Sequence, residues 1–187
     1  MASKKEILSL QKNSCMLIYL IGYMGCGKSK IAKQLSNYFG IEYIDTDSYI
    51  EEKQRTSISE IWNTQGEIGF RELEKQTLET LITTVQKPTI IACGGGLPCY
   101  GQNMQLLLHT GISFYIKQNT GIIINRLSQP AQQLKRPLIK NLTTTQLEKY
   151  VTLQILQREA FYTQANYTID TQHLQKMKTQ LSIILSL

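Results

Sequence analysis

The chain has 187 residues, 42% of them hydrophobic, and a formal net charge of +6 from 20 lysines and arginines against 14 acidic residues. This length and apolar content suit one compact domain with a sizeable core, and a second domain is not needed. The basic residues are dispersed along the chain, which argues against a nucleic-acid-binding protein and favours local sites for phosphate or carboxylate groups.

Five apolar runs predict strands that alternate with helices. The first run, CMLIYLI at residues 15–21, is typical of a strand buried on both faces of a parallel sheet. The helix that follows has apolar residues at helical spacing and ends at Gly40. Further strands are expected at 41–47, 89–93, 111–117 and 166–170, and further helices at about 48–85, from 122, at 145–164 and from about 173. This alternation predicts an α/β fold with a parallel sheet and right-handed crossovers.

The segment GYMGCGKS lies between the first strand and the first helix and has the spacing of a phosphate-binding loop. Its glycines let backbone N–H groups turn toward phosphate oxygens, and the helix N-terminus adds partial positive charge. Lys28 can reach the β and γ phosphates, and the Ser29 hydroxyl can ligate Mg²⁺. The purely structural alternative is a glycine-rich turn that only joins the strand to the helix. The expected nucleotide-binding residues here are Gly22, Gly25, Cys26, Gly27, Lys28, Ser29 and Lys30.

Two aspartates follow the second strand. Asp45 and Asp47 are two residues apart, which would place both carboxylates on the same side of a strand, beside the phosphate-binding loop. One can hold Mg²⁺ and the other can orient or deprotonate a hydroxyl nucleophile. Because the third strand ends without an acidic residue, Asp45 is the better candidate for the metal. The alternative for Asp47 is a helix N-cap.

The third strand ends in three successive glycines, Gly94, Gly95 and Gly96, which would let a ligand rest against bare backbone. Arg71 and Arg158 each have acidic neighbours in sequence and could simply form surface ion pairs on helices.

A third arginine, Arg136, lies in the polar segment SQPAQQLKRPLIKN, which has little to pack with. A mobile basic loop of this kind suits a lid over a phosphate group, although an isolated loop arginine is most often only solvated.

Cysteines and apolar runs indicate the compartment. Cys15, Cys26, Cys93 and Cys99 have neither the paired spacing of a zinc site nor the density of a disulfide scaffold. No apolar run approaches the roughly 20 residues that span a bilayer, and the leader at residues 1–14 has no signal-peptide core. We therefore expect reduced thiols, a cytoplasmic location without membrane contact, and a monomer.

Together these motifs resemble the shikimate kinases. The resemblance rests on GYMGCGKS, DTD, GEIGFRELE, ACGGG, KRPLI and REAFY, in that order, and extends from about Met16 to about Ile169. It implies a nucleoside monophosphate kinase-like fold over 15–187, with a five-stranded parallel sheet, a substrate-binding subdomain at about 46–85 and a lid at about 128–142. It also implies transfer of the γ-phosphoryl group of ATP to the 3-hydroxyl of shikimate, in chorismate and aromatic amino acid biosynthesis.

The resemblance assigns roles to the candidate residues. Asp47, Arg71, Arg158 and the three glycines look like the shikimate site, in which guanidinium groups hold the carboxylate and Asp47 orients the 3-hydroxyl. Lys28 and Arg136 would neutralise charge on the transferred phosphoryl group. Two positions depart from the family: Gln129 stands where an arginine commonly stacks on adenine, and the adenine contact near the C-terminus falls around Gln175.

Two alternatives remain at this point. A gluconate or nucleotide kinase of similar architecture would share the phosphate-binding loop, but the GGG segment and the pair Arg71 and Arg158 favour an acceptor with a carboxylate. A non-catalytic nucleotide-binding regulator would be expected to have lost Asp47, Arg71 or Arg158, and all three are present.

Overall fold

The structure is a computed structural model in which residues 16–185 are described, apart from the side chain of Gln172. The leader predicted at residues 1–14, and Cys15, lie outside these residues. Cys26, Cys93 and Cys99 are free thiols. None of the helices within 16–185 is long and apolar enough to cross a bilayer.

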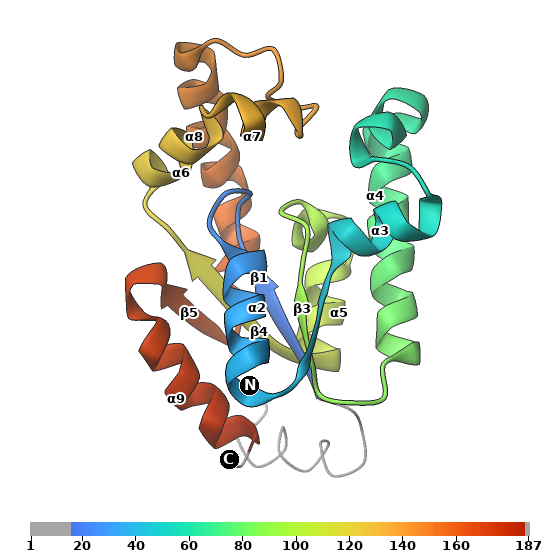
Figure 1. Ribbon diagram of the computed structural model, residues 1–187, viewed down its shortest axis with the longest axis vertical. Coiled ribbons are helices and arrows are strands. Elements are labelled where there is room, and N and C mark those ends of the chain that lie inside the picture. Colours follow the sequence, from blue (N-terminus) through green and yellow to red (C-terminus); the bar gives the residue numbers. More distant parts are fainter. Residues whose placement is uncertain (1–15, 186–187) are drawn as a thin grey trace.

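Five parallel strands form one sheet in the order β2-β3-β1-β4-β5 (Figure 1). The central strand β1 has the sequence LIYLI and every residue of it is buried, as its uninterrupted apolar run predicts. The parallel sheet and its five strands are therefore confirmed. The strands are β1 Leu17–Ile21, β2 Glu42–Asp45, β3 Thr89–Ala92, β4 Gly111–Lys117 and β5 Tyr167–Asp170.

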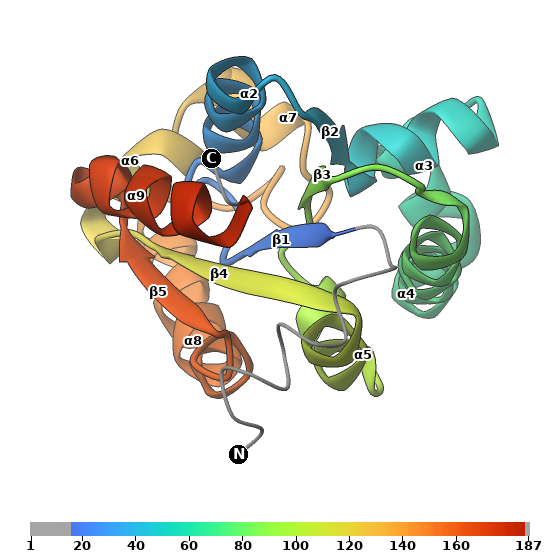
Figure 2. The ribbon, with the colours of Figure 1, turned by 90° about the horizontal axis from the view of Figure 1, so that it is seen from below.

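Helices cover both faces of the sheet. Figure 2 shows α2 and α9 on one face and α5 and α8 on the other, with α3 and α4 beside the β2 edge. The helices are α2 Lys28–Phe39, α3 Thr46–Gln54, α4 Ile58–Thr84, α5 Asn103–Thr110, α6 Thr120–Leu127, α7 Pro130–Leu134, α8 Thr144–Tyr162 and α9 Leu174–Leu185, with short 3₁₀ turns at Leu97–Cys99 and Thr171–His173.

The sequence-based expectations need three corrections. The strand expected at 41–47 ends at Asp45, because the Asp45 side chain accepts hydrogen bonds from the backbone of the next turn and starts α3. The helical region expected at about 48–85 is two helices, and the second is kinked at Gly66, whose φ of 67° and ψ of −171° are not helical. Helix α5 was not anticipated.

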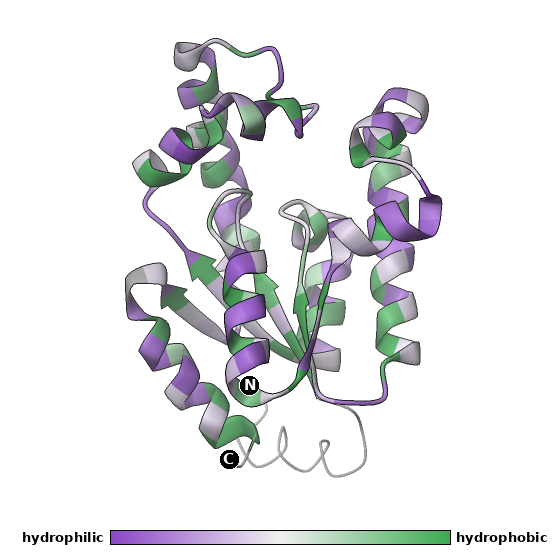
Figure 3. Cartoon of the chain, in the orientation of Figure 1, coloured by the Kyte–Doolittle hydropathy of each residue, from purple (hydrophilic) through white to green (hydrophobic). Residues whose placement is uncertain are grey.

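The apolar residues form a main core and a small second cluster. The main core lies between the sheet and its helices, where Figure 3 shows hydrophobic strands and helix faces turned inward. The second cluster joins Ile50 of α3 to Ile61 and Phe70 of α4, with Trp62 packed against it. This separate packing supports α3 and the first half of α4 as a unit beside the carboxyl ends of the strands.

Candidate active site

The phosphate-binding loop connects β1 to α2 at the carboxyl end of the sheet. Gly22 has a φ of 140°, and a Cβ there would lie 2.7 Å from the carbonyl oxygen of Ile116, so the position requires glycine. Gly27 precedes α2 with a φ of 108°, and no side chain caps the first turn of that helix. The first amides of α2 are thus available to an anion at this end of the sheet.

Lys28 lies at the start of α2 with its side chain largely buried beneath the loop. Its ammonium group donates hydrogen bonds to the carbonyl oxygens of Gly22 at 2.7 Å and Tyr23 at 3.1 Å. The predicted cation therefore stands inside the loop, and Cys26 is 3.8 Å from it through Sγ. This position suits a role for Cys26 as a small filler of the loop.

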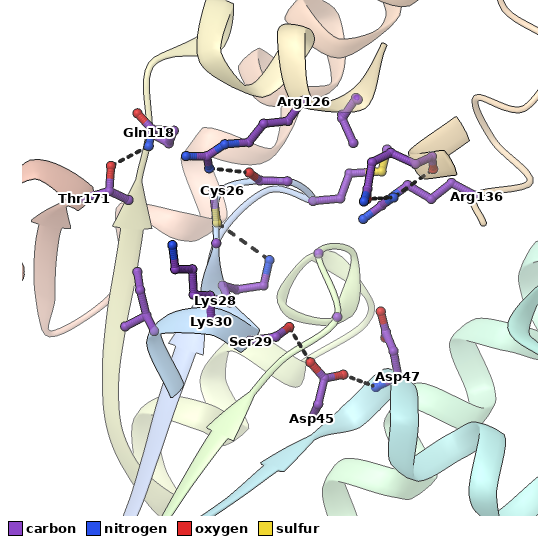
Figure 4. A pocket seen from close by; sticks show the side chains of 18 of the residues that line it. Cys26, Lys28, Ser29, Lys30, Asp45, Asp47, Gln118, Arg126, Arg136 and Thr171 are labelled. Atoms are coloured by element: carbon purple, nitrogen blue, oxygen red, sulfur yellow. Dashed lines mark hydrogen bonds between the residues drawn. The ribbon is translucent and has the colours of Figure 1, made fainter. Parts of the chain in front are cut away.

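Ser29 and Asp45 bring two oxygen ligands together. The Ser29 hydroxyl donates to Asp45 Oδ2 at 2.5 Å, while Asp45 Oδ1 accepts from the backbone N–H groups of Asp47 at 3.1 Å and Ser48 at 3.3 Å (Figure 4). The N-cap of α3 is therefore Asp45, and Asp47 lies in the first turn of that helix. A hydroxyl and a carboxylate at this distance fit the hard oxygen ligands that Mg²⁺ prefers.

Asp47 and Glu74 both turn a carboxylate oxygen toward Gly94. Asp47 Oδ1 and Glu74 Oε1 are buried without a hydrogen-bond partner among the described residues. A Cβ at Gly94 would lie 2.8 Å from Asp47 Oδ1 and would overlap Glu74 Oε1. Burial raises the pKa of Asp47 to about 6, with the charge of Asp45 adding to the rise and Lys28 opposing it. Burial likewise raises the pKa of Glu74 to about 7, against the effect of Arg71.

Arg71 forms the helix ion pairs that its neighbours suggested and also lines a cavity. Its guanidinium group donates to Glu74 at 2.6 Å and to Glu67 at 3.1 Å, and only 9% of its side chain is exposed. A side chain at Gly96 would overlap this guanidinium group. The ion pairs and the site are therefore compatible, because Glu67 and Glu74 hold the guanidinium group against the glycine segment.

Arg158 projects from α8 toward the same cavity. Its guanidinium group lies 5.6 Å from the ring centroid of Tyr23. Within residues 16–185 no carboxylate comes within ion-pair distance of it. The ion pair considered with Glu159 is absent there, since Glu159 instead accepts from Lys117 at 2.7 Å.

Two neighbouring cavities hold these residues. The first, of about 850 Å³, is lined by the phosphate-binding loop including Lys30, by Asp45, by Gly94 and by lid-side residues. The second, of about 460 Å³, is lined by Arg71, Glu74, Gly96 and Arg158 among others. Asp47, Gly95 and Arg136 line both cavities. A larger site and a smaller site thus open onto each other at a wall that contains the carboxylates of Asp45 and Asp47 and the guanidinium group of Arg136.

Comparison with known proteins identifies the family. A family model described as shikimate kinase matches residues 24–187. The shikimate kinase of Flavobacterium johnsoniae is 38% identical over 153 residues, which are 81% of this chain and 87% of that protein. The crystal structure of shikimate kinase from Bacteroides thetaiotaomicron superposes with a TM-score of 0.80 at 29% identity, covering 92% of this chain and 99% of that one. The chain belongs to the shikimate kinase family.

A second solved shikimate kinase, from Acinetobacter baumannii in complex with shikimate, has a TM-score of 0.78 at 30% identity and covers 95% of this chain and 97% of that one. The predicted family, fold and activity are therefore confirmed: the protein is an ATP-dependent shikimate kinase of aromatic amino acid biosynthesis. This assignment replaces the gluconate kinase and regulator alternatives.

In this shikimate kinase the wall formed by α6 and α7 differs from the sequence-based expectation. Arg126 of α6 lines the larger cavity and donates to the carbonyl oxygen of Gly25 at 2.9 Å. Gln129 lines the same cavity. Because Arg126 supplies a positive charge there, the glutamine does not leave this wall without a cation. At the C-terminal side Thr171 and Leu174 line the cavity, whereas Gln175 is exposed and does not.

Arg136, between α7 and α8, completes the wall shared by the two cavities. Its Nη1 donates to the backbone oxygen of Gln132 at 2.8 Å and to the side-chain oxygen of the same residue at 2.6 Å. Burial lowers the pKa of Arg136, and the charge of Asp47 opposes that change. Figure 4 shows Arg136 across the opening from Asp45 and Asp47.

Proposed function

We propose that the larger cavity binds ATP, that the smaller one binds shikimate, and that phosphoryl transfer takes place where they meet. The observation that carries this proposal is that Asp47 and Arg136 line both cavities. Their volumes of about 850 and 460 Å³ suit a nucleoside triphosphate and a small cyclic acid, respectively.

In the smaller cavity, Arg71 and Arg158 would hold the carboxylate of shikimate. Arg71 is fixed by Glu67 and Glu74, whereas Arg158 has no carboxylate partner among the described residues and can give its charge to the substrate. Gly94, Gly95 and Gly96 present bare backbone beside these arginines. The carboxylate end would then point away from the phosphate-binding loop, and the hydroxyls toward Asp47.

At the junction, Asp47 would orient the 3-hydroxyl and accept its proton as the hydroxyl oxygen attacks the γ-phosphorus. The bond from that phosphorus to the β–γ bridging oxygen breaks, and ADP leaves with the bonding electrons. Lys28 and Arg136 lie on the two sides of this point and would stabilise the charge on the transferred group, where positioning and electrostatics supply most of the catalysis.

Ser29 and Asp45 would hold Mg²⁺, which when bound neutralises phosphate charge. Gly22, Gly25, Cys26, Gly27 and Lys30 would surround the phosphates, and Arg126 and Gln129 would line the nucleotide farther along the same wall. Within this arrangement residues of about 46–85 form the substrate-binding subdomain, and residues of about 128–142 form the lid.

The experiment is a coupled assay of ADP release with and without shikimate, on the wild type and on Asp47→Asn. We expect release to depend on shikimate, and Asp47→Asn to bind ATP normally while transfer falls by about 100-fold or more, because the base is lost. Glu79→Gln, which changes an exposed carboxylate outside both cavities, should behave as wild type. ADP release that ignores shikimate would contradict the acceptor, and an unchanged kcat in Asp47→Asn would remove Asp47 from the mechanism.

A further inference from the structure

Tyr23 is a buried tyrosine of the phosphate-binding loop that lines neither of the two cavities. The residue is 2% exposed and its side chain belongs to the main core. Its carbonyl oxygen accepts hydrogen bonds from the ammonium group of Lys28 at 3.1 Å and from the N–H group of Cys26 at 3.2 Å. The backbone that carries the ring is therefore held within the loop, and close packing leaves the buried ring little freedom to move.

The Tyr23 ring lies against Arg158 of α8. The guanidinium carbon of Arg158 is 5.6 Å from the ring centroid, which is within the range of a cation–π contact. Burial raises the pKa of the Tyr23 hydroxyl far above its ordinary value, nearby Tyr150 adds to the rise, and Arg158 opposes it. The hydroxyl therefore stays protonated at the pH of an assay, and the guanidinium group meets a neutral aromatic ring and not a phenolate.

This contact supports Arg158 without occupying its N–H groups. Arg158 is half-buried and lines the smaller cavity, and among the described residues no carboxylate pairs with it. A ring attracts a cation through its face, so the N–H groups of the guanidinium remain available for a carboxylate. Arg71 differs, because ion pairs with Glu67 and Glu74 fix its guanidinium group. The two arginines of the smaller cavity are thus supported by different means, one by acids and the other by an aromatic ring.

The size of the effect follows from the orientations open to Arg158. A cation–π contact of ordinary strength favours one orientation of a guanidinium group over the others by about fivefold. When the orientation that binds is populated for only a fraction of the time, the apparent affinity falls by that fraction. Loss of the ring should therefore weaken the binding of an acid at Arg158 by about fivefold.

We propose that Tyr23 is a positioning residue of the acceptor site: its ring holds the guanidinium group of Arg158 in the orientation that binds the carboxylate of shikimate. The proposal rests on the proposed function, in which Arg158 contacts that carboxylate. Tyr23 lines neither cavity and so touches neither substrate in this arrangement. A side chain of the phosphate-binding loop thereby acts on the affinity for the acceptor.

The test compares Tyr23→Leu, which removes the ring, with Tyr23→Phe, which keeps it. We expect Tyr23→Leu to raise the KM for shikimate about fivefold, with the KM for ATP and kcat changed less than about twofold. Tyr23→Phe is the matched control: the hydroxyl that it removes is buried without a hydrogen-bond partner among the described residues, so the KM should stay at the wild-type value.

Two results of this comparison would overturn the proposal. An equal rise in the KM for shikimate in Tyr23→Phe would show that the ring face is not what matters. A rise in the KM for ATP as large as that for shikimate in Tyr23→Leu would show that the substitution only disturbs the loop.

A double-mutant cycle with Arg158→Gln separates this inference from the proposed function. If the ring acts through Arg158, adding Tyr23→Leu to Arg158→Gln changes the KM for shikimate less than about twofold, because no guanidinium group is left to position. A raised KM in Arg158→Gln that Tyr23→Leu raises about fivefold again would overturn the inference alone. An Arg158→Gln variant with the wild-type KM would contradict the proposed role of Arg158, and the inference with it.

Binding measured without turnover covers the case in which Tyr23→Leu is too unstable to assay at the usual temperature. Trp62 is the only tryptophan of the chain and lines the smaller cavity, so its fluorescence can report shikimate binding. In titrations without ATP, at a low temperature at which circular dichroism shows Tyr23→Leu to be folded, we expect its Kd for shikimate to be about fivefold above that of the wild type and of Tyr23→Phe. Equal Kd values in all three proteins would overturn the proposal.

Discussion

Glu74 holds its carboxylate almost completely out of solvent, with Oε2 2.6 Å from Arg71 and Oε1 without a hydrogen-bond partner among residues 16–185. Burying a charge in this way is costly unless it is fully paired. Burial therefore raises the pKa of Glu74 to about 7, Arg71 lowers it, and the neighbouring charge of Asp47 raises it further. The smaller cavity is thus lined by two buried carboxyl groups, Asp47 and Glu74, and the charge of one disfavours ionisation of the other.

This raised pKa predicts how stability depends on pH. In the unfolded chain Glu74 titrates near its ordinary value of 4.5, so between pH 4.5 and about 7 the folded protein holds the proton more tightly. The stability contributed by this proton is complete below pH 4.5 and is lost as the pH rises through about 7. We expect the free energy of unfolding of the wild type, relative to Glu74→Gln, to fall by up to about 3 kcal/mol from pH 4.5 to pH 8.

Urea unfolding of both proteins across this pH range measures the difference. Glu72→Gln, two residues earlier on α4 and with 45% of its side chain exposed, provides the control and should give a profile parallel to the wild type. If Glu74→Gln also runs parallel to the wild type, Glu74 titrates normally in the folded protein.

At the scale of single residues, the sequence predicts which groups approach the phosphates but not which acids are buried. Lys28, Ser29 and Asp45 lie within a motif whose spacing determines their positions. Glu74 is three residues after Arg71, a spacing that is the same on a solvated helix face and on a buried one. The glycine segment, which follows β3 and packs against this acid, helps to remove it from solvent.

Among the elements, α4 contains a kink at Gly66. The small cluster with α3 takes residues from both sides of this kink, Ile61 before it and Phe70 after it, and Arg71 and Glu74 lie on the second half of the helix. The φ of 67° and ψ of −171° at Gly66 lie in a region that residues with a side chain rarely enter. The angle between the two halves of the helix thus depends on glycine at this position.

Gly66→Ala should therefore destabilise the protein although the added methyl group meets no atom within 4 Å. We expect a loss of about 1–3 kcal/mol from backbone strain, or a fall in Tm of about 3–10 °C in thermal unfolding. Gly121→Ala, in the first turn of α6 and without a positive φ, serves as the control: its methyl group would stand 3.2 Å from Asn119 Oδ1, which a small shift of that side chain relieves, and Tm should fall by less than about 2 °C. An equal Tm for Gly66→Ala and the wild type would show that the kink does not depend on glycine.

Elements with long or unbroken patterns were predicted well, and those decided by a few local hydrogen bonds were not. Strand β1 has an uninterrupted apolar run, β4 has a run interrupted only at Ser113, and helix α2 has apolar residues at helical spacing. Helix α5 has eight residues and no capping side chain, so its apolar residues fit a loop or a strand equally well. The end of β2 at Asp45 depends on the capping hydrogen bonds of the Asp45 side chain. The difference in free energy between this cap and continuation of the strand is small.

For the molecule as a whole, the two cavities lie between two groups of helices above the carboxyl ends of the strands. Figure 1 shows α6, α7 and α8 on one side of this opening and α3 with the first half of α4 on the other. Arg136 extends from the first group to the wall shared by both cavities. Because each ligand would contact Arg136 in the proposed arrangement, we expect residues 128–142 to respond most strongly when both ligands are bound.

Hydrogen exchange can test this expectation. With shikimate and a non-hydrolysable ATP analogue together, we expect amides in residues 128–142 to exchange at least about tenfold more slowly than with either ligand alone. Amides of β1 and β4 in the sheet should keep their exchange rates and serve as the internal control. Equal protection of 128–142 by the nucleotide analogue alone would contradict a lid that senses both ligands.

At this scale the alternation of strands and helices predicts a parallel sheet, and the ordered motifs predict the family. The strand order is not contained in the same pattern, because it depends on which side each crossover takes. Nor does the pattern show that the larger and the smaller cavity share one wall, since Asp47 and Arg136 are separated by about ninety positions in the chain.

The contact between Gly95 and the phosphate-binding loop bears on how this enzyme can be altered. A Cβ at Gly95 would stand 3.1 Å from the backbone nitrogen of Met24, so the glycine segment packs directly on the phosphate-binding loop. A library that varies the glycine segment to accept a new alcohol will therefore also disturb ATP binding. Directed evolution toward other acceptors should proceed through paired substitutions in the glycine segment and the phosphate-binding loop. Substitution of Arg71 or Arg158 is the other route, because these side chains can change without moving either backbone segment.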